Sequence, residues 1–203
     1  MTNLLVVTSS PKTGGSVSGD LVERFVAALE ADTEVVRTQR NVGLAPPPHL
    51  DETTIGAFYT PEDQHTPEQT KAVKLSDELI AEVEAADIIV VGSPMHNFGV
   101  SSGLKTWLDH IARVGKTFRY TKAGPEGLLG GKKVFVLSAR GGDYSKTSPA
   151  HAMDQQEPYL KTVFGFMGLT DVTFIHAQGV NQGGESVDRA KQAVQAAAQA
   201  LAA

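Results

Sequence analysis

The chain alternates short apolar runs with segments of helical periodicity, and this alternation restricts its fold more than any other feature. Five runs are rich in apolar residues and have the length of strands; they cover residues 3–9, 34–37, 87–92, 133–138 and 172–177. Near-continuous apolar runs, of which 87–92 and 133–138 are the clearest, are typical of parallel strands covered on both faces. The sequence therefore predicts an α/β fold with a parallel sheet between two layers of helices.

Helical patterns separate these runs. The clearest begins with Thr66, Pro67 and Gln69, which form a capping box with a proline at the first helical position, and it continues to about residue 86. Others begin at about residue 18 and cover about 102–113, 155–168 and 185–201. Five strands alternating with helices fit the order 2-1-3-4-5 of flavodoxin-like sheets, in which the ligand crevice lies between strands 1 and 3.

Composition narrows the class of protein. A chain of 203 residues is long enough for one α/β domain with a full core, and we expect that domain to span residues 1–203. Its net charge of -5 gives no basic footprint for nucleic acid, and no apolar run approaches the roughly 20 residues of a membrane span. There is no cysteine, which excludes disulfides and thiol catalysis, and no secretory signal pattern, so a cytoplasmic location is expected.

One long segment, residues 41–65, does not fit a minimal fold of this kind. It contains four prolines and little periodicity, and a connection of this length in a compact domain is usually functional or interfacial. A loosely packed surface excursion is the alternative. Its apolar residues favour contact with a partner subunit; they are Leu44, Leu50, Ile55, Phe58 and Tyr59.

The loop that follows the first strand is rich in hydroxyl groups. Residues 10–18 read SPKTGGSVS and lead into a helical pattern. Such a loop can bind phosphate, because backbone N–H groups and the helix dipole both point at the anion. It has the spacing of neither common nucleotide fingerprint, and Ser10, Ser16 and Ser18 suit a terminal monophosphate better than a pyrophosphate. Capping of the following helix by these serines is the alternative interpretation.

Two further polar loops are expected at the same edge of the sheet. Residues 93–99 read SPMHNFG and leave the third strand, and residues 139–144 read ARGGDY and leave the fourth. In the predicted order, the serine loop lies across the crevice from the first of these two loops. A phosphate held by the serine loop therefore places the rest of its ligand between the other two.

The residues of these two loops suit a flat, hydrogen-bonding ring. Pro94, Met95 and Phe98 can pack on an aromatic plane, while Asn97 supplies amide donors. The two glycines of the second loop have no Cβ, so the backbone can approach a ring edge closely. A terminal phosphate, a flexible chain and a flat ring describe flavin mononucleotide (FMN), whereas a nicotinamide dinucleotide would require the missing glycine fingerprint.

The same motifs resemble those of the FMN-dependent NADH azoreductases. The similar segments are spread over almost the whole chain and cover residues 10–18, 94–98 (PMHNF), 118–127 (FRYTKAGPEG), 138–142 (SARGG) and 159–168 (YLKTVFGFMG). The resemblance implies a flavodoxin-like homodimer that binds FMN near the subunit interface and reduces quinones and azo compounds. His96, Ala139 and the pair Asp143-Tyr144 depart from the family pattern, which affects substrate preference more than cofactor identity.

The resemblance also implies roles for individual residues. The phosphate would be held by Ser10, Ser16, Val17 and Ser18. The isoalloxazine and ribityl parts would be held by Pro94, Met95, His96, Asn97, Phe98, Ala139, Arg140, Gly141 and Gly142. The acceptor pocket would be lined by Phe118 and Tyr120 together with Phe164 or Phe166.

In an enzyme of this kind the flavin carries the redox chemistry and the protein positions it. NADH or NADPH would deliver hydride, and a quinone or azo acceptor would then replace the oxidised nicotinamide in a ping-pong cycle. The catalytic candidates are Asn97, a donor able to stabilise negative charge, together with His96 and Tyr144. Local hydrogen bonding by His96 and packing by Tyr144 are the structural alternatives. No histidine pair has metal-ligand spacing, so no metal is expected.

Two other functions compete with this one. The main alternative is a non-catalytic electron carrier of the flavodoxin type. Such carriers need a small exposed docking surface, whereas the net charge here is modest and segments 41–65 and 114–130 would cover the flavin. The second alternative is a hydrolase or phosphotransferase that acts on a phosphate bound in the serine loop. Such an enzyme would need a general base, and no histidine or paired carboxylate lies in or beside that loop.

Overall fold

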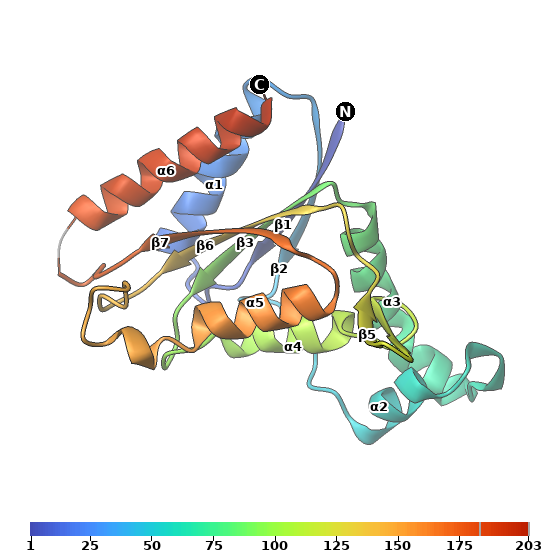
Figure 1. Ribbon diagram of the computed structural model, residues 1–203. Coiled ribbons are helices and arrows are strands. Elements are labelled where there is room, and N and C mark those ends of the chain that lie inside the picture. The colour runs from blue at the N-terminus through green and yellow to red at the C-terminus, as the bar shows by residue number, and fades with distance from the viewer. Residues whose placement is uncertain (183, 203) are drawn as a thin grey trace.

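A five-stranded parallel sheet forms the centre of the chain (Figure 1). In this computed structural model, which describes residues 1–182 and 184–202, the sheet consists of β1 (Thr2–Thr8), β2 (Val35–Asn41), β3 (Ile88–Pro94), β6 (Lys133–Ala139) and β7 (Asp171–Ala177). The order is β2-β1-β3-β6-β7. Counted within the sheet, this is the predicted 2-1-3-4-5; the chain numbering differs because the two strands of a separate hairpin lie between β3 and β6.

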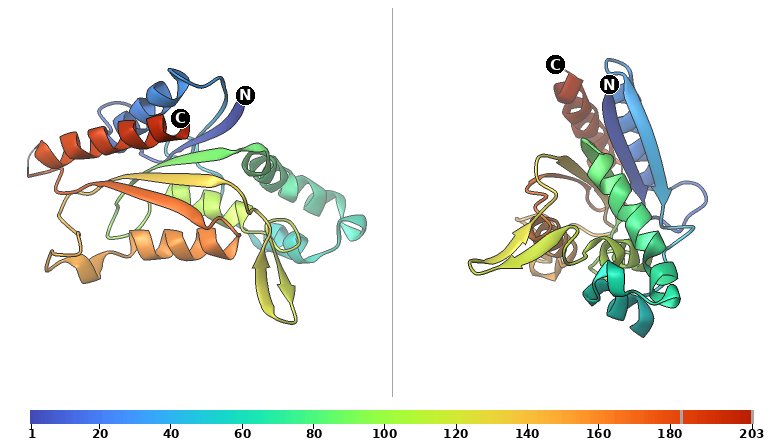
Figure 2. Two further views of the ribbon diagram at one scale, coloured as in Figure 1. Left: turned by 45° about the horizontal axis from the view of Figure 1, so that its top comes forward. Right: turned by 90° about the vertical axis from the view of Figure 1, so that its right-hand side faces the viewer.

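Helices cover both faces of the sheet, as predicted (Figures 1 and 2). One face carries α1 (Val17–Glu30) and α6 (Glu185–Ala202), and the other carries α3 (Pro67–Ala85), α4 (Ser102–Ile111) and α5 (Gln156–Phe166). Side chains alternate along each strand. Leu4 and Val6 therefore join the apolar cluster under α1 and α6, while Leu5 and Val7 join the cluster under the other three helices.

The strand register brings the carboxyl ends of four strands to one edge. Thr8 at the end of β1 pairs with Gly92 in β3. Pro94 pairs with Ala139 of β6, which in turn pairs with Ala177 of β7. The loops that follow β1, β3, β6 and β7 therefore leave the sheet side by side.

The segment 41–65 is more ordered than its sequence pattern predicted. It contains helix α2 (Glu52–Tyr59), capped by Asp51, and a 3-10 turn at Glu62–Gln64. Phe58 of α2 packs against Val73 of α3. The alternative of a loosely packed surface excursion therefore does not describe α2, which packs against α3, while contact of this segment with a partner subunit stays a prediction.

A hairpin formed by β4 (Phe118–Thr121) and β5 (Gly124–Gly127) was not predicted. The two strands pair antiparallel and project from the body of the molecule (Figure 2). The base of the hairpin lies beside the C-terminal end of α5. There Gly127, the last residue of β5, packs closely on Gly168: a Cβ at residue 127 would lie 2.0 Å from the nitrogen of Gly168. Since α5 leads into the amino end of β7, the hairpin lies at the opposite end of the sheet from the four loops.

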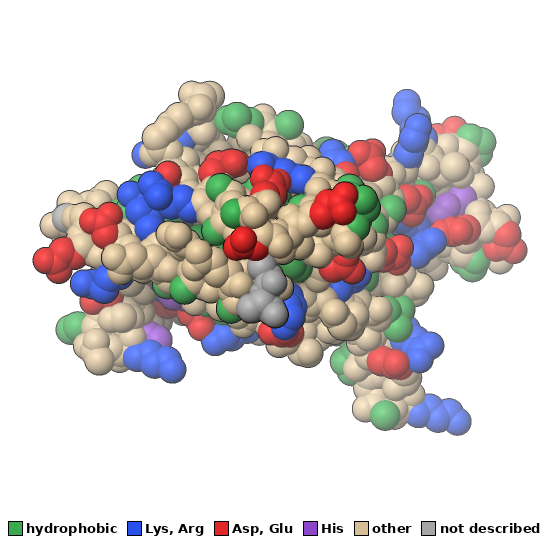
Figure 3. Space-filling model, turned by 90° about the horizontal axis from the view of Figure 1, so that it is seen from above, with side chains coloured by type: hydrophobic (Ala, Val, Ile, Leu, Met, Phe, Trp, Pro, Cys, Tyr) green, Lys and Arg blue, Asp and Glu red, His purple; other side chains and the backbone are tan. Residues whose placement is uncertain are grey.

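The face covered by α1 and α6 carries charges of both signs, interspersed with one another (Figure 3). Asp20 on α1 accepts from Arg24 at 3.1 Å and lies 3.7 Å from Lys191 of α6. Of the helices described, none combines the length and the apolar run that crossing a bilayer requires.

Candidate functional site

A cavity of about 230 Å³ lies at the carboxyl edge of the sheet, where four loops meet. The sequence-predicted residues that line it are Ser10, Ser16, Val17, Ser18, Pro94, Met95, His96, Ala139 and Gly141. Pro11, Lys12, Val180 and Asn181 also line it and were not predicted. The loop after β7, which supplies the last two, leaves the same edge of the sheet, so the topology alone was the signal that could have found it.

The serine loop ends at the N-terminus of α1. Ser16 is the N-cap residue: its Oγ accepts from the backbone N–H of Gly19 at 3.2 Å and lies 3.2 Å from the Oγ of Ser18. The N–H groups of Val17 and Ser18 belong to the first helical turn and have no intrahelical acceptor. Capping and anion binding are therefore compatible here, because the cap occupies one N–H group and leaves others directed out of the helix end.

The charge of the cavity suits a phosphate. Of the described residues that line it, Lys12 is basic and none is acidic. Hydroxyls, helix N-terminal N–H groups and an ammonium are the donor set that favours a phosphate over a neutral ligand.

The loop after β3 makes a tight turn through left-handed backbone. Asn97 and Phe98 have φ values of 48° and 71°, and His96 and Gly99 exchange backbone hydrogen bonds of 3.0 and 2.9 Å around them. Asparagine tolerates this region, but a phenylalanine there is strained and persists only where its surroundings hold it. Part of that support is visible: the carbonyl of Phe98 accepts from the N–H of Gln155 at 3.0 Å.

In the loop after β6, the backbone and the side chain of Arg140 have different roles. Neighbouring Ala139 and Gly141 line the cavity, but the guanidinium is 1 % exposed and lies behind the loop. There its Nη1 pairs with Asp154 at 2.9 Å, and its Nε donates to Gln156 at 3.2 Å. Burial lowers the pKa of Arg140, and the Asp154 carboxylate opposes that shift. Arg140 was predicted to bind the cofactor; since its guanidinium is bound to Asp154 and Gln156, the part of Arg140 that stays a candidate for that contact is its backbone.

Of the three catalytic candidates, His96, Asn97 and Tyr144, one lines the cavity. His96 is exposed and lines it. Asn97 is exposed on the neighbouring turn, and neither it, Phe98 nor Gly142 lines the cavity. Tyr144 lies farther along its loop, with its backbone N–H held by the Oε1 of Gln178 at 3.1 Å.

The predicted acceptor-pocket residues do not meet the cavity within one chain. Phe118 packs against Phe166 and Tyr120, with ring centroids 4.4 and 5.7 Å apart, at the base of the hairpin. Tyr120 is 67 % exposed there. Phe164, in contrast, is fully buried in the core under α3, α4 and α5. Of the two alternatives on α5, Phe164 is thus corrected to a core residue, and Phe166 joins the aromatic group.

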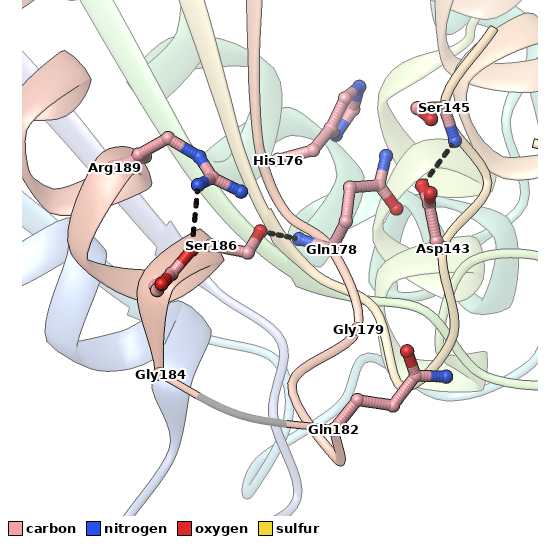
Figure 4. Close-up of a pocket in the computed structure, with 10 residues that line it drawn as sticks. Asp143, Ser145, His176, Gln178, Gly179, Gln182, Gly184, Ser186 and Arg189 are labelled. Atoms are coloured by element: carbon pink, nitrogen blue, oxygen red, sulfur yellow. Dashed lines mark hydrogen bonds and ion pairs between the residues drawn. The ribbon is translucent and has the colours of Figure 1, made fainter. Parts of the chain in front are cut away.

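A larger hollow of about 690 Å³ lies outside β7, behind the loop that follows β6 (Figure 4). It contains Gln178, whose N–H donates to Ser186 at 2.9 Å, and His176, whose Nε2 lies 2.7 Å from Glu157. Burial, assisted by Arg140, lowers the pKa of His176. This hollow lies on the outer edge of the sheet rather than in the crevice between β1 and β3, so it is separate from the predicted cofactor site. Among the described residues, no cluster of three or more His, Asp or Glu side chains could hold a metal.

Known proteins resemble this chain over its full length. The sequence model of the family described as flavodoxin-like fold matches residues 2–202. An FMN-dependent NADH:quinone oxidoreductase of Herminiimonas arsenicoxydans is 50% identical over 193 residues, which are 94% of this chain and 93% of that protein. One of Paraburkholderia phymatum is 47% identical over 207 residues and covers 100% of both chains.

A solved structure is similar as well. The FMN-dependent NADH-azoreductase from Bacillus anthracis, crystallised in complex with FMN, superposes with a TM-score of 0.90, a sequence identity of 28% and 100% coverage of both chains. Its fold is therefore shared from end to end.

Proposed function

The chain belongs to the flavodoxin-like fold family, and we propose that it uses bound FMN to pass two electrons from NADH to quinones and azo compounds. It is an FMN-dependent NADH oxidoreductase, because relatives that share about half of its residues over nearly the whole length are named for that activity. The observation that carries the proposal in this chain is the cavity between the serine loop and the loops after β3 and β6, which lies at the predicted switch point of the sheet.

In this proposal, each group of lining residues would bind a different part of FMN. Ser10, Ser16 and Ser18, with the first N–H groups of α1 and with Lys12, would hold the phosphate. Pro94 and Met95 on one side of the cavity and Ala139 and Gly141 on the other would enclose the ring and ribityl chain, with the backbone of Arg140 and Gly142 extending the second side. FMN when bound supplies the hydride acceptor and the two-electron donor of the reaction.

The chain's own residues would orient the ring and stabilise charge on it. Asn97, on the turn beside the cavity, would donate its amide N–H to the polar rim of the ring. The backbone N–H groups of the glycine loop would donate to the same rim, where negative charge develops on reduction. His96 lines the cavity and would shape the space for the acceptor, while solvent supplies the protons of the products.

A second copy of the chain would complete the acceptor pocket. Phe118, Tyr120 and Phe166 form one aromatic group at the opposite end of the sheet from the cavity. In a homodimer, the exposed Tyr120 of one protomer would reach the cavity of the other. We propose such a dimer, and sedimentation of the purified protein tests it: a monomer at micromolar concentration would contradict it.

An electron carrier is not favoured, because the relatives named above are oxidoreductases over their whole length. Within the family, we propose a single FMN-binding domain over residues 1–203 and NADH as the preferred donor, with NADPH as the second. A cytoplasmic location agrees with a chain that contains no cysteine. Neither nucleic acid nor a membrane is part of this proposal.

The experiment is a spectrum of the purified protein with added FMN, followed by anaerobic NADH and then a benzoquinone. We expect flavin bands near-stoichiometric with protein, bleached by NADH and restored by the quinone, with no reaction between NADH and quinone when FMN is omitted. Protein that retains no flavin would overturn the proposal. Repeating the bleaching with NADPH gives the donor preference, and replacing the quinone by an azo dye tests the second acceptor class.

A further inference from the structure

We propose that Gln156 is a positioning residue that fixes the two ring-binding loops of the flavin site relative to one another. The inference rests on the proposed function and extends it to a residue that does not line the cavity. Gln156 is the first residue of α5 and is 1 % exposed.

The side-chain amide of Gln156 joins the exits of β3 and β6. Its Nε2 donates to both the carbonyl oxygen and the Oγ of Ser93, each at 3.0 Å, and its Oε1 accepts from the Nε of Arg140 at 3.2 Å. The orientation of the amide follows from chemistry, since a carbonyl can only accept and a guanidinium can only donate. Both N–H donors and one of the two acceptor sites of the amide are thereby used, and these three hydrogen bonds join the two loops.

The two residues that the amide joins lie directly beside the cavity. Ser93 immediately precedes Pro94 and Met95, which form one wall, and Arg140 lies between Ala139 and Gly141, which form the other. The last backbone hydrogen bond between these strands, from the N–H of Met95 to the carbonyl of Ala139, is 2.9 Å long. Beyond it the two chains separate to form the cavity walls, so Gln156 supplies the cross-link at the point where the sheet ladder stops.

Asp154 holds Gln156 in place. Its Oδ1 accepts from the backbone N–H groups of Gln156 and Glu157 at 3.0 and 3.2 Å, which caps the start of α5. Its Oδ2 pairs with Arg140 at 2.9 Å. One carboxylate therefore fixes both the helix end that carries the amide and the guanidinium to which the amide binds.

The same segment also holds the far end of the loop after β3. The N–H of Gln155 donates to the carbonyl of Phe98, the residue in strained left-handed backbone. Ser93 and Phe98 are thus held from adjacent residues of one helix start. Ser93, Arg140, Asp154 and Gln156 are 0, 1, 7 and 1 % exposed, so water cannot substitute for a lost partner, and removing the amide would leave buried groups unpaired.

The test compares Gln156→Met, which keeps the length of the side chain and removes its hydrogen bonds, with the wild-type protein. FMN and riboflavin are titrated into the flavin-free protein, and the visible absorption and circular dichroism of the flavin are recorded at saturating FMN. Riboflavin lacks the phosphate, so it reports on the ring site alone. We expect both dissociation constants to rise by the same factor, roughly tenfold or more, and the bound-flavin spectrum to change.

A matched control separates positioning from general loss of stability. Ser76→Ala removes another buried hydrogen bond, from the Oγ of Ser76 to the carbonyl of His110 at 2.6 Å, between α3 and α4. This variant should lower the melting temperature while both flavin affinities and the spectrum stay at wild-type values. If Gln156→Met weakens flavin binding no more than Ser76→Ala does, and leaves the spectrum unchanged, the inference is wrong.

A second variant tests the bridge itself. Gln156→Glu keeps an acceptor for Arg140 but has no donor for Ser93, so it should weaken FMN and riboflavin as Gln156→Met does. If Gln156→Glu binds both flavins with wild-type affinity, the hydrogen bonds from Gln156 to Ser93 are not needed to position the loops, and the inference is wrong. The two proposals can be told apart. If the wild-type protein binds no FMN, the proposed function is wrong. If the wild-type protein binds FMN and Gln156→Met binds it with the same affinity and the same spectrum, only the positioning role is wrong.

Discussion

The rings of Phe98 and Tyr144 meet edge-on, with their centroids 6.2 Å apart and their planes at 80°. One residue belongs to the loop after β3 and the other to the loop after β6, so the contact joins the outer parts of the two ring-binding loops. Edge-to-face pairs of this kind contribute about 0.5–1.5 kcal/mol beyond the area that they bury. The contact therefore helps to hold Phe98 in its left-handed backbone conformation.

Tyr144→Ala should weaken FMN binding several-fold, because Phe98 would lose the ring that packs against it. Tyr144→Phe keeps that ring and should bind FMN like the wild-type protein, provided that the hydroxyl makes no contact with the flavin. Fluorescence titration of FMN measures both variants. Equal losses in the two variants would show that the hydroxyl matters and that Tyr144 touches the cofactor itself.

Replacing Ser16 and Ser18 together by alanine should weaken FMN retention at least tenfold, or about 1.4 kcal/mol, because hydrogen bonds to a charged phosphate are lost. Riboflavin affinity should change little. Ser16→Ala also removes the cap of α1, at a cost of about 1 kcal/mol of stability. Thr66→Ala, which removes the cap of α3, is the matched control and should lower the melting temperature without affecting FMN.

The side chain and the backbone of Asn97 can be separated by two substitutions. Asn97→Gly removes the amide and accepts the φ of 48° without strain, so it should reduce turnover while the melting temperature stays within a few degrees. Asn97→Ala removes the same amide but adds roughly 1 kcal/mol of left-handed strain. Stopped-flow reduction by NADH and thermal unfolding measure the two effects. A large fall in melting temperature in Asn97→Gly would make Asn97 a structural residue.

Stability should depend on pH through His176. Burial, with Arg140, places its pKa below the ordinary value of 6.5, so the unfolded chain binds a proton more readily than the folded one. This contribution is complete above about pH 6.5 and is lost as the pH falls through the folded pKa. Burial alone would raise the pKa of Glu157, but hydrogen bonds from Lys161 and His176 lower it below 4.5, so its own contribution is lost only at more acidic pH.

Urea unfolding at pH 7.5 and pH 5.5 checks this dependence. The free energy of unfolding should fall more steeply for the wild-type protein than for His176→Gln, which has no proton to gain. Identical slopes for wild-type protein and His176→Gln would contradict the assignment.

The strands and the cavity-forming loops could be predicted because their signals are local. The apolar run at 87–92 and the capping box at Thr66 each depend on residues close in sequence, and both elements formed where expected. The parallel topology then placed the loops after β1, β3 and β6 together without any knowledge of side chains.

The hairpin was missed for a local reason as well. Its second strand, Gly124–Gly127, contains two glycines and a proline, which are depleted in strands. It pairs along its whole length with Phe118–Thr121, and Arg119 of that strand lies 2.8 Å from Glu126 on the exposed surface. The whole hairpin lies within ten consecutive residues, but the composition of its second strand does not show that the two strands pair.

The sequence by itself determined the order of elements, the edge at which the ligand loops meet and the hydroxyl-rich loop at the start of α1, since periodicity and loop composition act over a few residues. Only the tertiary structure decided where individual side chains point. Arg140 turns inward because Asp154 and Gln156 lie behind it, and Phe164 is buried while Phe166 packs against the hairpin. The direction of a side chain depends on partners distant in sequence, and folding alone brings those partners together.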